Sequence, residues 1–150
     1  MKPILEIKSK TGVLHFRRWK LFGTAWFSVF LHGIYESDKD KHMHNHPWSY
    51  CSIIVKGEYV EEYLDGSDTK IRFRNSRPLR NFYNPKYWPQ LFKFQPSTRF
   101  HKILKLVTPV VYSIVIARTN DTRLWGYNVD GKFIDNITYR ELKNNGKLED

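Results

Sequence analysis

Short apolar and aromatic segments, separated by turn residues, recur along the whole chain. Runs of this kind, bounded by Gly, Pro, Asn and Asp, are typical of strands. The pairs Asp65-Gly66 and Asp130-Gly131 favour tight hairpins between neighbouring segments. The pattern predicts strands over residues 14–19, 25–35, 42–46, 50–55, 58–64, 70–74, 91–94, 100–107, 110–118, 124–129 and 132–137.

Two stretches lack this pattern. Residues 75–90, rich in Asn, Pro, Arg and Tyr, predict a long irregular loop, and loops of this length usually carry function. The tail from Thr138 onward predicts a short helix or a loose end. Many short strands at regular spacing indicate an all-β fold, an antiparallel sandwich or barrel. With no internal repeat and no linker, we expect one domain over residues 1–150.

Composition supports the β-rich fold and adds a strong charge. Alanine occurs only at Ala25 and Ala117, whereas Tyr, Phe, Trp, Ile and Val are plentiful. Lys and Arg number 25 against 15 Asp and Glu, which gives a formal net charge of +10. That excess attracts nucleic acid and equally suits a small anionic substrate. The alternative is a soluble basic protein without a charged partner.

The single cysteine and the N-terminal sequence bear on where the protein works. Cys51 alone excludes an internal disulfide framework and fits a reducing compartment. The N-terminus lacks the long apolar region of a signal peptide. The longest apolar-rich run, residues 110–117, is far shorter than the roughly 18 residues of a membrane span. We expect a soluble, cytoplasmic protein without a membrane partner.

Histidines supply the strongest candidate chemistry. His42, His44 and His46 alternate along one segment, so a strand would place all three imidazoles on one face. A fourth, His101, begins a later apolar strand. Neutral imidazole is a common ligand of divalent transition metals, so the set predicts a metal site. The alternative is a pocket of hydrogen-bonded histidines that holds an anion or nothing.

These residues resemble the motifs of the cupin superfamily, small metal-binding jelly rolls. The first motif, His-x-His followed by Glu and Gly, aligns with His44, His46 and Gly57, and the second with Pro96 and His101. The resemblance covers roughly residues 30–118 and implies an antiparallel jelly-roll barrel. Small single-domain cupins of phage and bacterial genomes are more similar still. They share the segments Leu31-His32, His42-x-His44-x-His46-Pro47-Trp48 and Arg123-Leu124-Trp125-Gly126-Tyr127.

The biochemical function of those phage and bacterial proteins is largely unassigned, so the likeness implies a fold and a metal site but no reaction. If the chain is phage-encoded, it would work in the host cytoplasm. Thr98 stands where the second motif usually has Gly, and Tyr50 stands where the first has its Glu ligand. Tyrosine is an uncommon ligand because its hydroxyl pKa is near 10. The resemblance therefore implies a three-histidine site, His44, His46 and His101, for one divalent transition metal (Fe, Zn, Mn or Ni). His42 would be a neighbour of the ligands or an alternative ligand.

If alternation continues across Pro47, Trp48, Tyr50 and Ser52 share the inward face. Tyr50 would then be a hydrogen-bond donor or general acid/base beside the metal, or an aromatic wall of the barrel. Cys51 would point away from the site and pack as a small core residue. His32 either faces the cavity or is a hydrogen-bonded core histidine.

Arginines crowd the later half of the chain, at positions 72, 74, 77, 80, 99, 118 and 123. Guanidinium groups bind carboxylate and phosphate bidentately, so Arg72, Arg99 and Arg118, with Trp48, are candidate substrate-binding residues. Tyr83, Tyr87 and Trp88 lie among the basic residues, a combination that can hold single-stranded nucleic acid. The alternative is a solvated basic surface.

Two functions remain open from the sequence. The first is a metal-dependent cupin enzyme, of oxygenase or isomerase type, acting on a small anionic substrate. The second is a non-enzymatic nucleic-acid or nucleotide-binding module that uses the basic aromatic loop. The sequence also leaves open whether the chain forms a homodimer.

Overall fold

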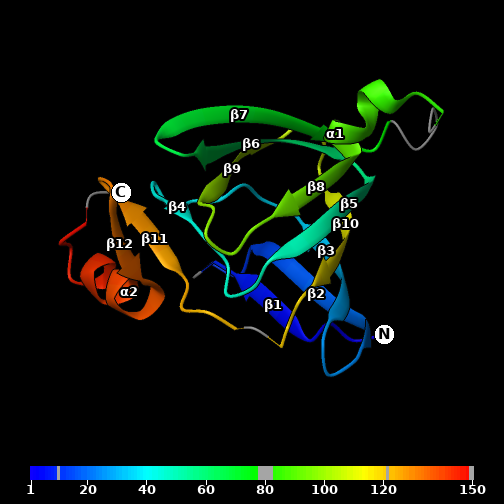
Figure 1. The fold of residues 1–150 in the computed structure, drawn as a ribbon. Helices are drawn as coiled ribbons and strands as arrows, with labels where there is room; N and C mark the ends of the chain where they lie inside the picture. The colour runs from blue at the N-terminus through cyan, green and yellow to red at the C-terminus, as the bar shows by residue number, and fades with distance from the viewer. Residues whose placement is uncertain (10, 78–82, 121, 149–150) are drawn as a thin grey trace.

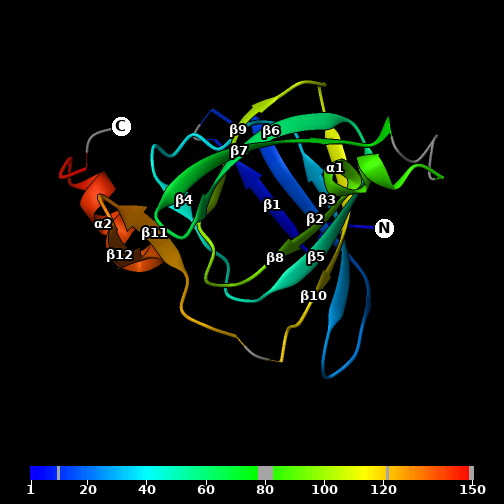
Figure 2. The same cartoon turned by 45° about the horizontal axis from the view of Figure 1, so that its top comes forward.

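The computed structural model describes residues 1–9, 11–77, 83–120 and 122–148, and it contains two antiparallel six-stranded sheets that face each other (Figures 1 and 2). The first sheet has the strand order β1 (Leu5–Lys8), β2 (Leu14–Gly23), β3 (Ser28–Ile34), β10 (Val111–Ala117), β5 (Tyr50–Lys56) and β8 (Phe92–Gln95). The second has the order β12 (Lys132–Asp135), β11 (Gly126–Val129), β4 (Met43–His44), β9 (His101–Leu106), β6 (Glu58–Asp65) and β7 (Asp68–Asn75). The predicted antiparallel jelly roll is confirmed.

The core lies between the sheets because alternate residues of each strand point inward. Along β10, Val111, Val115 and Ala117 are buried, whereas Ile116 is exposed. Val115 and Ala117 pack with Phe30 of β3, and Trp48 and Tyr50 lie against this cluster. The apolar surface removed from water here is the main favourable contribution to folding. It also fixes which residues face the interior.

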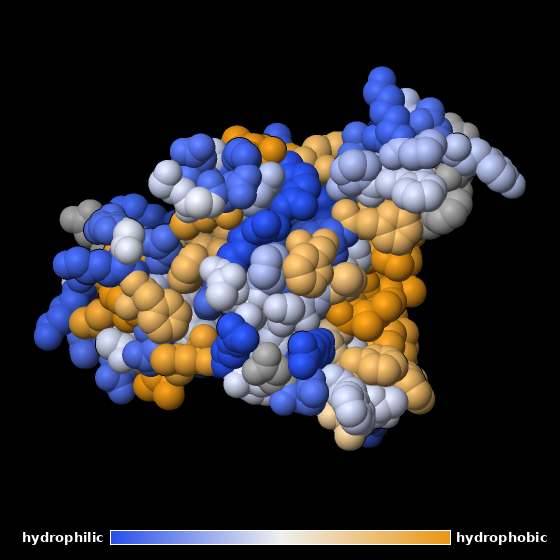
Figure 3. All heavy atoms as spheres, viewed as in Figure 1, coloured by the Kyte–Doolittle hydropathy of each residue, from blue (hydrophilic) through white to orange (hydrophobic). Residues whose placement is uncertain are grey.

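The outer face of the first sheet is unusually apolar. Phe94 and Ile116 point outward with 60% and 42% of their surfaces exposed. Figure 3 shows apolar side chains gathered on the side of the molecule where β5 and β10 lie. Cys51 lies on this face and is exposed. The expectation that Cys51 packs in the core is therefore wrong, because the alternation that turns Tyr50 inward turns Cys51 outward.

Several elements differ from those predicted. β1 was not predicted; it is an edge strand with every residue exposed, so it carries no burial signal. The predicted loop 75–90 contains a 3-10 turn, η2 (Pro85–Tyr87), and a helical turn, α1 (Trp88–Leu91). The side chain of Asn84 caps η2 by accepting a hydrogen bond from the Lys86 backbone N–H. The predicted strand over residues 42–46 is reduced to the two residues of β4.

The predicted short C-terminal helix is present as α2 (Asn136–Asn144). Asp135 begins it, because its carboxylate accepts hydrogen bonds from the backbone N–H groups of Ile137 and Thr138. Tyr139 is the buried residue of α2, and its ring stacks on Tyr127 of β11 at 3.7 Å. None of the described helices is long and apolar enough to cross a membrane.

Gly57 joins β5 to β6 and needs both its conformation and its small size. Its φ is +88°, and an added Cβ would lie 2.4 Å from the Val110 carbonyl oxygen. Gly66, in the β6–β7 hairpin, has a similar φ of +65° but open space around it. We expect Gly66→Ala to cost about 1 kcal/mol of unfolding free energy through backbone strain alone. Gly57→Ala should cost clearly more, and urea unfolding of both variants measures the difference. Equal losses would show that the contact with Val110 is unimportant.

Candidate metal centre

Three histidines converge between the sheets. His44 ends β4 and pairs directly with His101, the first residue of β9, while His46 follows two residues after β4. Each offers one ring nitrogen, and these three atoms lie within 4.8 Å of one another. The Nε2 atoms of His46 and His101 are 2.7 Å apart. The geometry fits a three-histidine metal site.

Backbone hydrogen bonds fix the segment that carries His44 and His46. The Asn45 backbone N–H donates to the Gly126 carbonyl, and the Gly126 N–H donates to the Asn45 side-chain oxygen. This two-way contact pins Asn45 against β11. An added Cβ at Gly126 would lie 2.1 Å from the Ile134 carbonyl oxygen, so this close approach needs glycine. His44 and His46, on either side of Asn45, are then held on the side that faces His101.

His42 and His32 lie apart from this cluster. The chain bends at residues 41 and 42, and the Nδ1 atom of His42 lies 3.1 Å from the Tyr139 hydroxyl. His32, on the inner face of β3, accepts a hydrogen bond at its Nε2 atom from Nε of Arg18 at 3.0 Å. Strict alternation therefore does not extend back to His42, because β4 is only two residues long.

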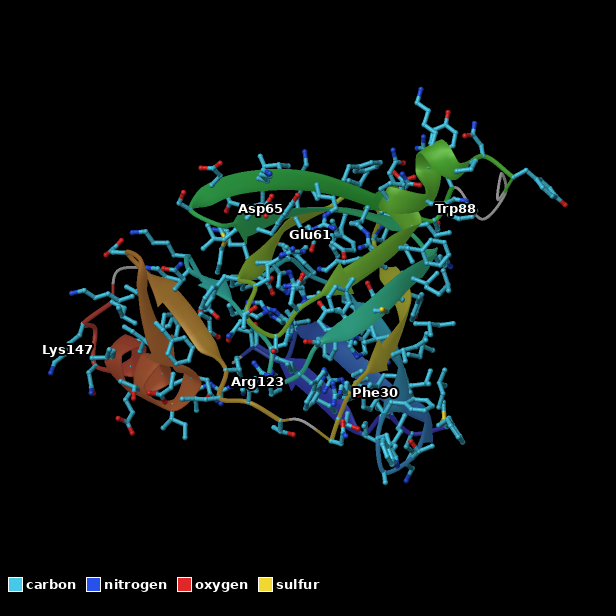
Figure 4. All side chains as sticks on the ribbon, viewed as in Figure 1. Phe30, Glu61, Asp65, Trp88, Arg123 and Lys147 are labelled. Atoms are coloured by element: carbon cyan, nitrogen blue, oxygen red, sulfur yellow. The ribbon has the colours of Figure 1, made fainter. Side chains whose placement is uncertain are left out.

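A buried carboxylate stands behind His101. Glu61 of β6 is fully buried, and Figure 4 shows it between the two sheets. Its Oε2 atom lies 3.3 Å from Nδ1 of His101 and 2.6 Å from Nζ of Lys93 on β8. Carboxylates in this position orient metal-binding histidines, because Nδ1–H turns to the carboxylate and Nε2 keeps its lone pair. The Nε2 atom of His101 faces His46, as that role requires.

Sequence reasoning missed Glu61 and Lys93. Tyr59, Glu61 and Tyr63 alternate along β6, so the parity that turns the two tyrosines inward also turns Glu61 inward. Lys93 alternates in the same way with the exposed Phe92 and Phe94. A charged residue between two aromatic positions of the same face was the signal for Glu61, whereas on β8 the apolar residues point outward and hide Lys93.

Burial sets the charge states of this group. Burial, followed by the charge of Lys93, lowers the pKa of His101 to about 3, although the contact with Glu61 opposes both. Burial also lowers the pKa of Lys93 to about 8, against the opposing effect of Glu61. For Glu61 burial raises the pKa, but Lys93 and His101 outweigh it and hold the pKa well below its usual range. Near neutral pH the centre thus combines an ionised carboxylate with a neutral imidazole.

Tyr50 stands beside the histidines. Its ring centroid lies 5.1 Å from that of His46, and Nζ of Lys93 lies 5.7 Å from the Tyr50 ring. Trp48 is half-buried and Ser52 is buried, so the predicted alternation across Pro47 holds. Burial raises the Tyr50 pKa well above its usual value, and Tyr59 and Glu61 raise it further. The hydroxyl therefore stays protonated and can donate a hydrogen bond.

A surface pocket of about 380 Å³ reaches Tyr50 from outside. Ser97 and Ala117 line it together with Arg118 and Arg123. Arg118 is exposed, and its Nε donates to the Asn120 side chain at 3.2 Å. Of the predicted substrate-binding arginines, Arg118 is therefore the one that shares a pocket with Tyr50.

The other described arginines among the predicted ones contact groups of the protein itself. Arg72 and Arg99 both lie over the Tyr63 ring, at 4.2 and 5.6 Å, and Arg72 also reaches the centre, because its Nε lies 3.3 Å from Glu61. Arg74 is fully buried and donates to the Leu91 carbonyl. Arg77 pairs with Glu58 at 2.6 Å, and Arg80 lies outside the described residues. These contacts give no support to a nucleic-acid groove along the described part of the basic loop.

Solved structures with a similar fold are known. HppE in its Fe(II) form with an alternative substrate matches with a TM-score of 0.52 at 12% identity, over 78% of this chain and 58% of that one. Hydroxypropylphosphonic acid epoxidase from S. wedmorenis gives 0.50 at 13% identity, over 78% and 57%. A formate complex of oxalate decarboxylase from Lactobacillus farciminis gives 0.53 at 9% identity, over 79% and 32%.

These likenesses show the fold. This chain spans little more than half of the length of the first two proteins and about a third of the last. No protein-family model matches the sequence, and no curated protein matches it.

The half-buried His32 gives stability a pH dependence. Burial of its ring, followed by the charge of the neighbouring Arg18, lowers its pKa to about 3. Below about pH 6.5 the unfolded chain therefore takes up a proton that the folded protein does not, and the unfolding free energy falls by up to ~1.4 kcal/mol per pH unit toward about pH 3. We expect His32→Gln to have a shallower loss of stability than wild type between about pH 7 and about pH 5, measured by urea unfolding. Parallel pH profiles would contradict this role of His32.

Proposed function

Because this chain has the cupin fold, with three histidines that fit a cupin metal site, we propose that it is a metal-dependent enzyme acting on a small anionic substrate. The observation that carries the proposal is the convergence of His44, His46 and His101, with Glu61 behind His101. Buried histidines without a ligand are costly, because their rings lose hydration and gain few hydrogen bonds in return. A bound metal would replace the lost hydration.

The donor set favours a divalent transition metal. Three neutral imidazoles suit iron, zinc, manganese or nickel, and three protein ligands leave further positions for substrate. The similar structures include a protein in its Fe(II) form. A metal held here would supply Lewis-acid or redox chemistry to a bound anion. Oxygenation and isomerisation are the reaction classes that we propose.

The surroundings of the site favour an anion. Lys93 and Arg72 both contact the Glu61 carboxylate, and Arg18 adds a further inward-facing positive charge. A divalent metal would add two positive charges to this excess. One similar structure is named for a phosphonic acid and another contains formate. A carboxylate or phosphonate substrate would balance the interior charge, and the Tyr50 hydroxyl would donate a proton or hydrogen bond to it.

Metal content tests the proposal most simply. Untagged wild-type protein should carry close to one equivalent of transition metal per chain by elemental analysis. His101→Ala should lose most of it, because one of three ligands is gone. His42→Ala is the matched control, since His42 contacts Tyr139 outside the cluster, and it should keep the metal. Full retention in His101→Ala, or equal loss in both variants, would contradict the assigned site.

Tyr50→Phe distinguishes a Tyr50 hydroxyl that takes part in the reaction from one that binds the metal. The ring volume is kept, so metal content should match wild type and stability should change by about 1 kcal/mol, the worth of one hydrogen bond. Turnover of whichever small carboxylate or phosphonate the wild type converts should fall about 10²-fold or more if Tyr50 transfers a proton. Loss of metal from Tyr50→Phe would make the hydroxyl a ligand. Unchanged turnover would leave Tyr50 as a wall of the barrel.

A further inference from the structure

Arg18 is an inward-facing cation without a carboxylate partner. It lies on β2 and is half-buried, and among the described residues no Asp or Glu lies within ion-pair distance of it. Its neighbour Arg17 differs: on the opposite face of the same strand, Arg17 donates from Nε to Glu6 at 2.7 Å. A half-buried guanidinium without an anion is costly, so its presence calls for an explanation.

The surroundings hold the Arg18 guanidinium in place. Its Cζ lies 5.5 Å from the Phe16 ring, 5.2 Å from the Phe30 ring and 5.6 Å from the Trp48 ring. Cation–π contacts of this kind fix the plane of the group without neutralising its charge. Nε is occupied, because it donates to His32. The two Nη atoms make no hydrogen bond to any described residue, so they form a free pair of donors.

A chain of ring contacts links Arg18 to the candidate metal centre. Trp48 and Phe30 belong to the cluster against which Tyr50 packs, and the Tyr50 ring contacts that of His46. The charge of Arg18 also contributes, after burial and closer charges, to the low pKa of His46. Arg18 thus faces the histidines across the interior, from the first sheet toward the second.

We propose that Arg18 is the anion-binding residue of this site and grips a carboxylate or a phosphoryl-type group with its two Nη atoms. Two parallel N–H donors match two oxygens on one central atom, which both groups present. The inference rests on the proposed function, since the anion would be part of the substrate held at the metal. It also goes beyond the proposed function, because it assigns the anion to one residue whose ring contacts involve none of the three candidate ligands.

The test titrates formate and inorganic phosphate into zinc-loaded and metal-free protein at low ionic strength, followed by calorimetry. Wild type should bind at least one of the two anions in both forms. Arg18→Gln should bind it at least tenfold more weakly, and Arg18→Lys should be intermediate because it keeps the charge but loses the paired donors. Arg17→Gln is the matched control on the same strand and should bind as wild type does.

The outcomes separate the two proposals. Arg18→Gln should keep its metal, because Arg18 is not a ligand. Equal anion affinity in wild type and Arg18→Gln, or no binding of either anion by wild type, overturns the role of Arg18 even if metal is present. Failure of wild type to bind metal overturns the proposed function, while titration of metal-free protein still decides the anion site. If Arg18→Gln does not fold, comparison of Arg18→Lys with Arg17→Gln gives the same decision.

Discussion

The contact of the Glu61 carboxylate with Lys93 and His101 organises the interior of the barrel. It joins β8 of the first sheet to β6 and β9 of the second. An isolated buried carboxylate would take up a proton, but Lys93, His101 and Arg72, all within 3.3 Å of it, keep it ionised. The ionised carboxylate in turn orders the His101 ring. The direction in which Nε2 of His101 points, and so the whole candidate centre, depends on this contact.

Charge is distributed asymmetrically around that contact. The second sheet supplies the histidines, Glu61 and Arg72, while the first supplies Lys93, Tyr50 and Arg18. Lys93, Arg72 and Arg18 carry positive charge against the one Glu61 carboxylate of this contact, so the centre is short of negative charge before any metal is added. An anion held between Arg18 and the histidines would supply the missing negative charge. The same arrangement explains why the surface arginines are not needed for this role, although Arg118 lines the pocket that reaches Tyr50.

The sequence predicted the architecture because each strand carries its own signal. Alternation alone predicts that Phe30 and Val115 face inward. His44, His46 and His101, predicted from their spacing and the family motifs, do lie together in the fold. The position of His42 could not be predicted, because no sequence signal marks the bend at residues 41 and 42 that turns it away from the other three histidines. The edge strand β1 carries no buried residue and so no signal either.

The site was less predictable than the fold, because its partners come from distant strands. Glu61 and Lys93 are 32 positions apart, and only the pairing of sheets shows that they meet. Arg18 was not among the predicted site residues, because alternation lets either Arg17 or Arg18 face inward and the register of β2 against β3 decides which one does. Pairwise charge contacts of this kind are fixed by topology and not by local pattern.

Anomalous diffraction from crystals of untagged protein grown with a transition metal tests the central claim most directly. We predict a single strong peak within about 2.0–2.3 Å of ring nitrogens of His44, His46 and His101. We also predict that Nδ1 of His101 remains in contact with Glu61. A peak bound by Glu61 itself or by His42, or an interior without a peak in metal-saturated crystals, would contradict it.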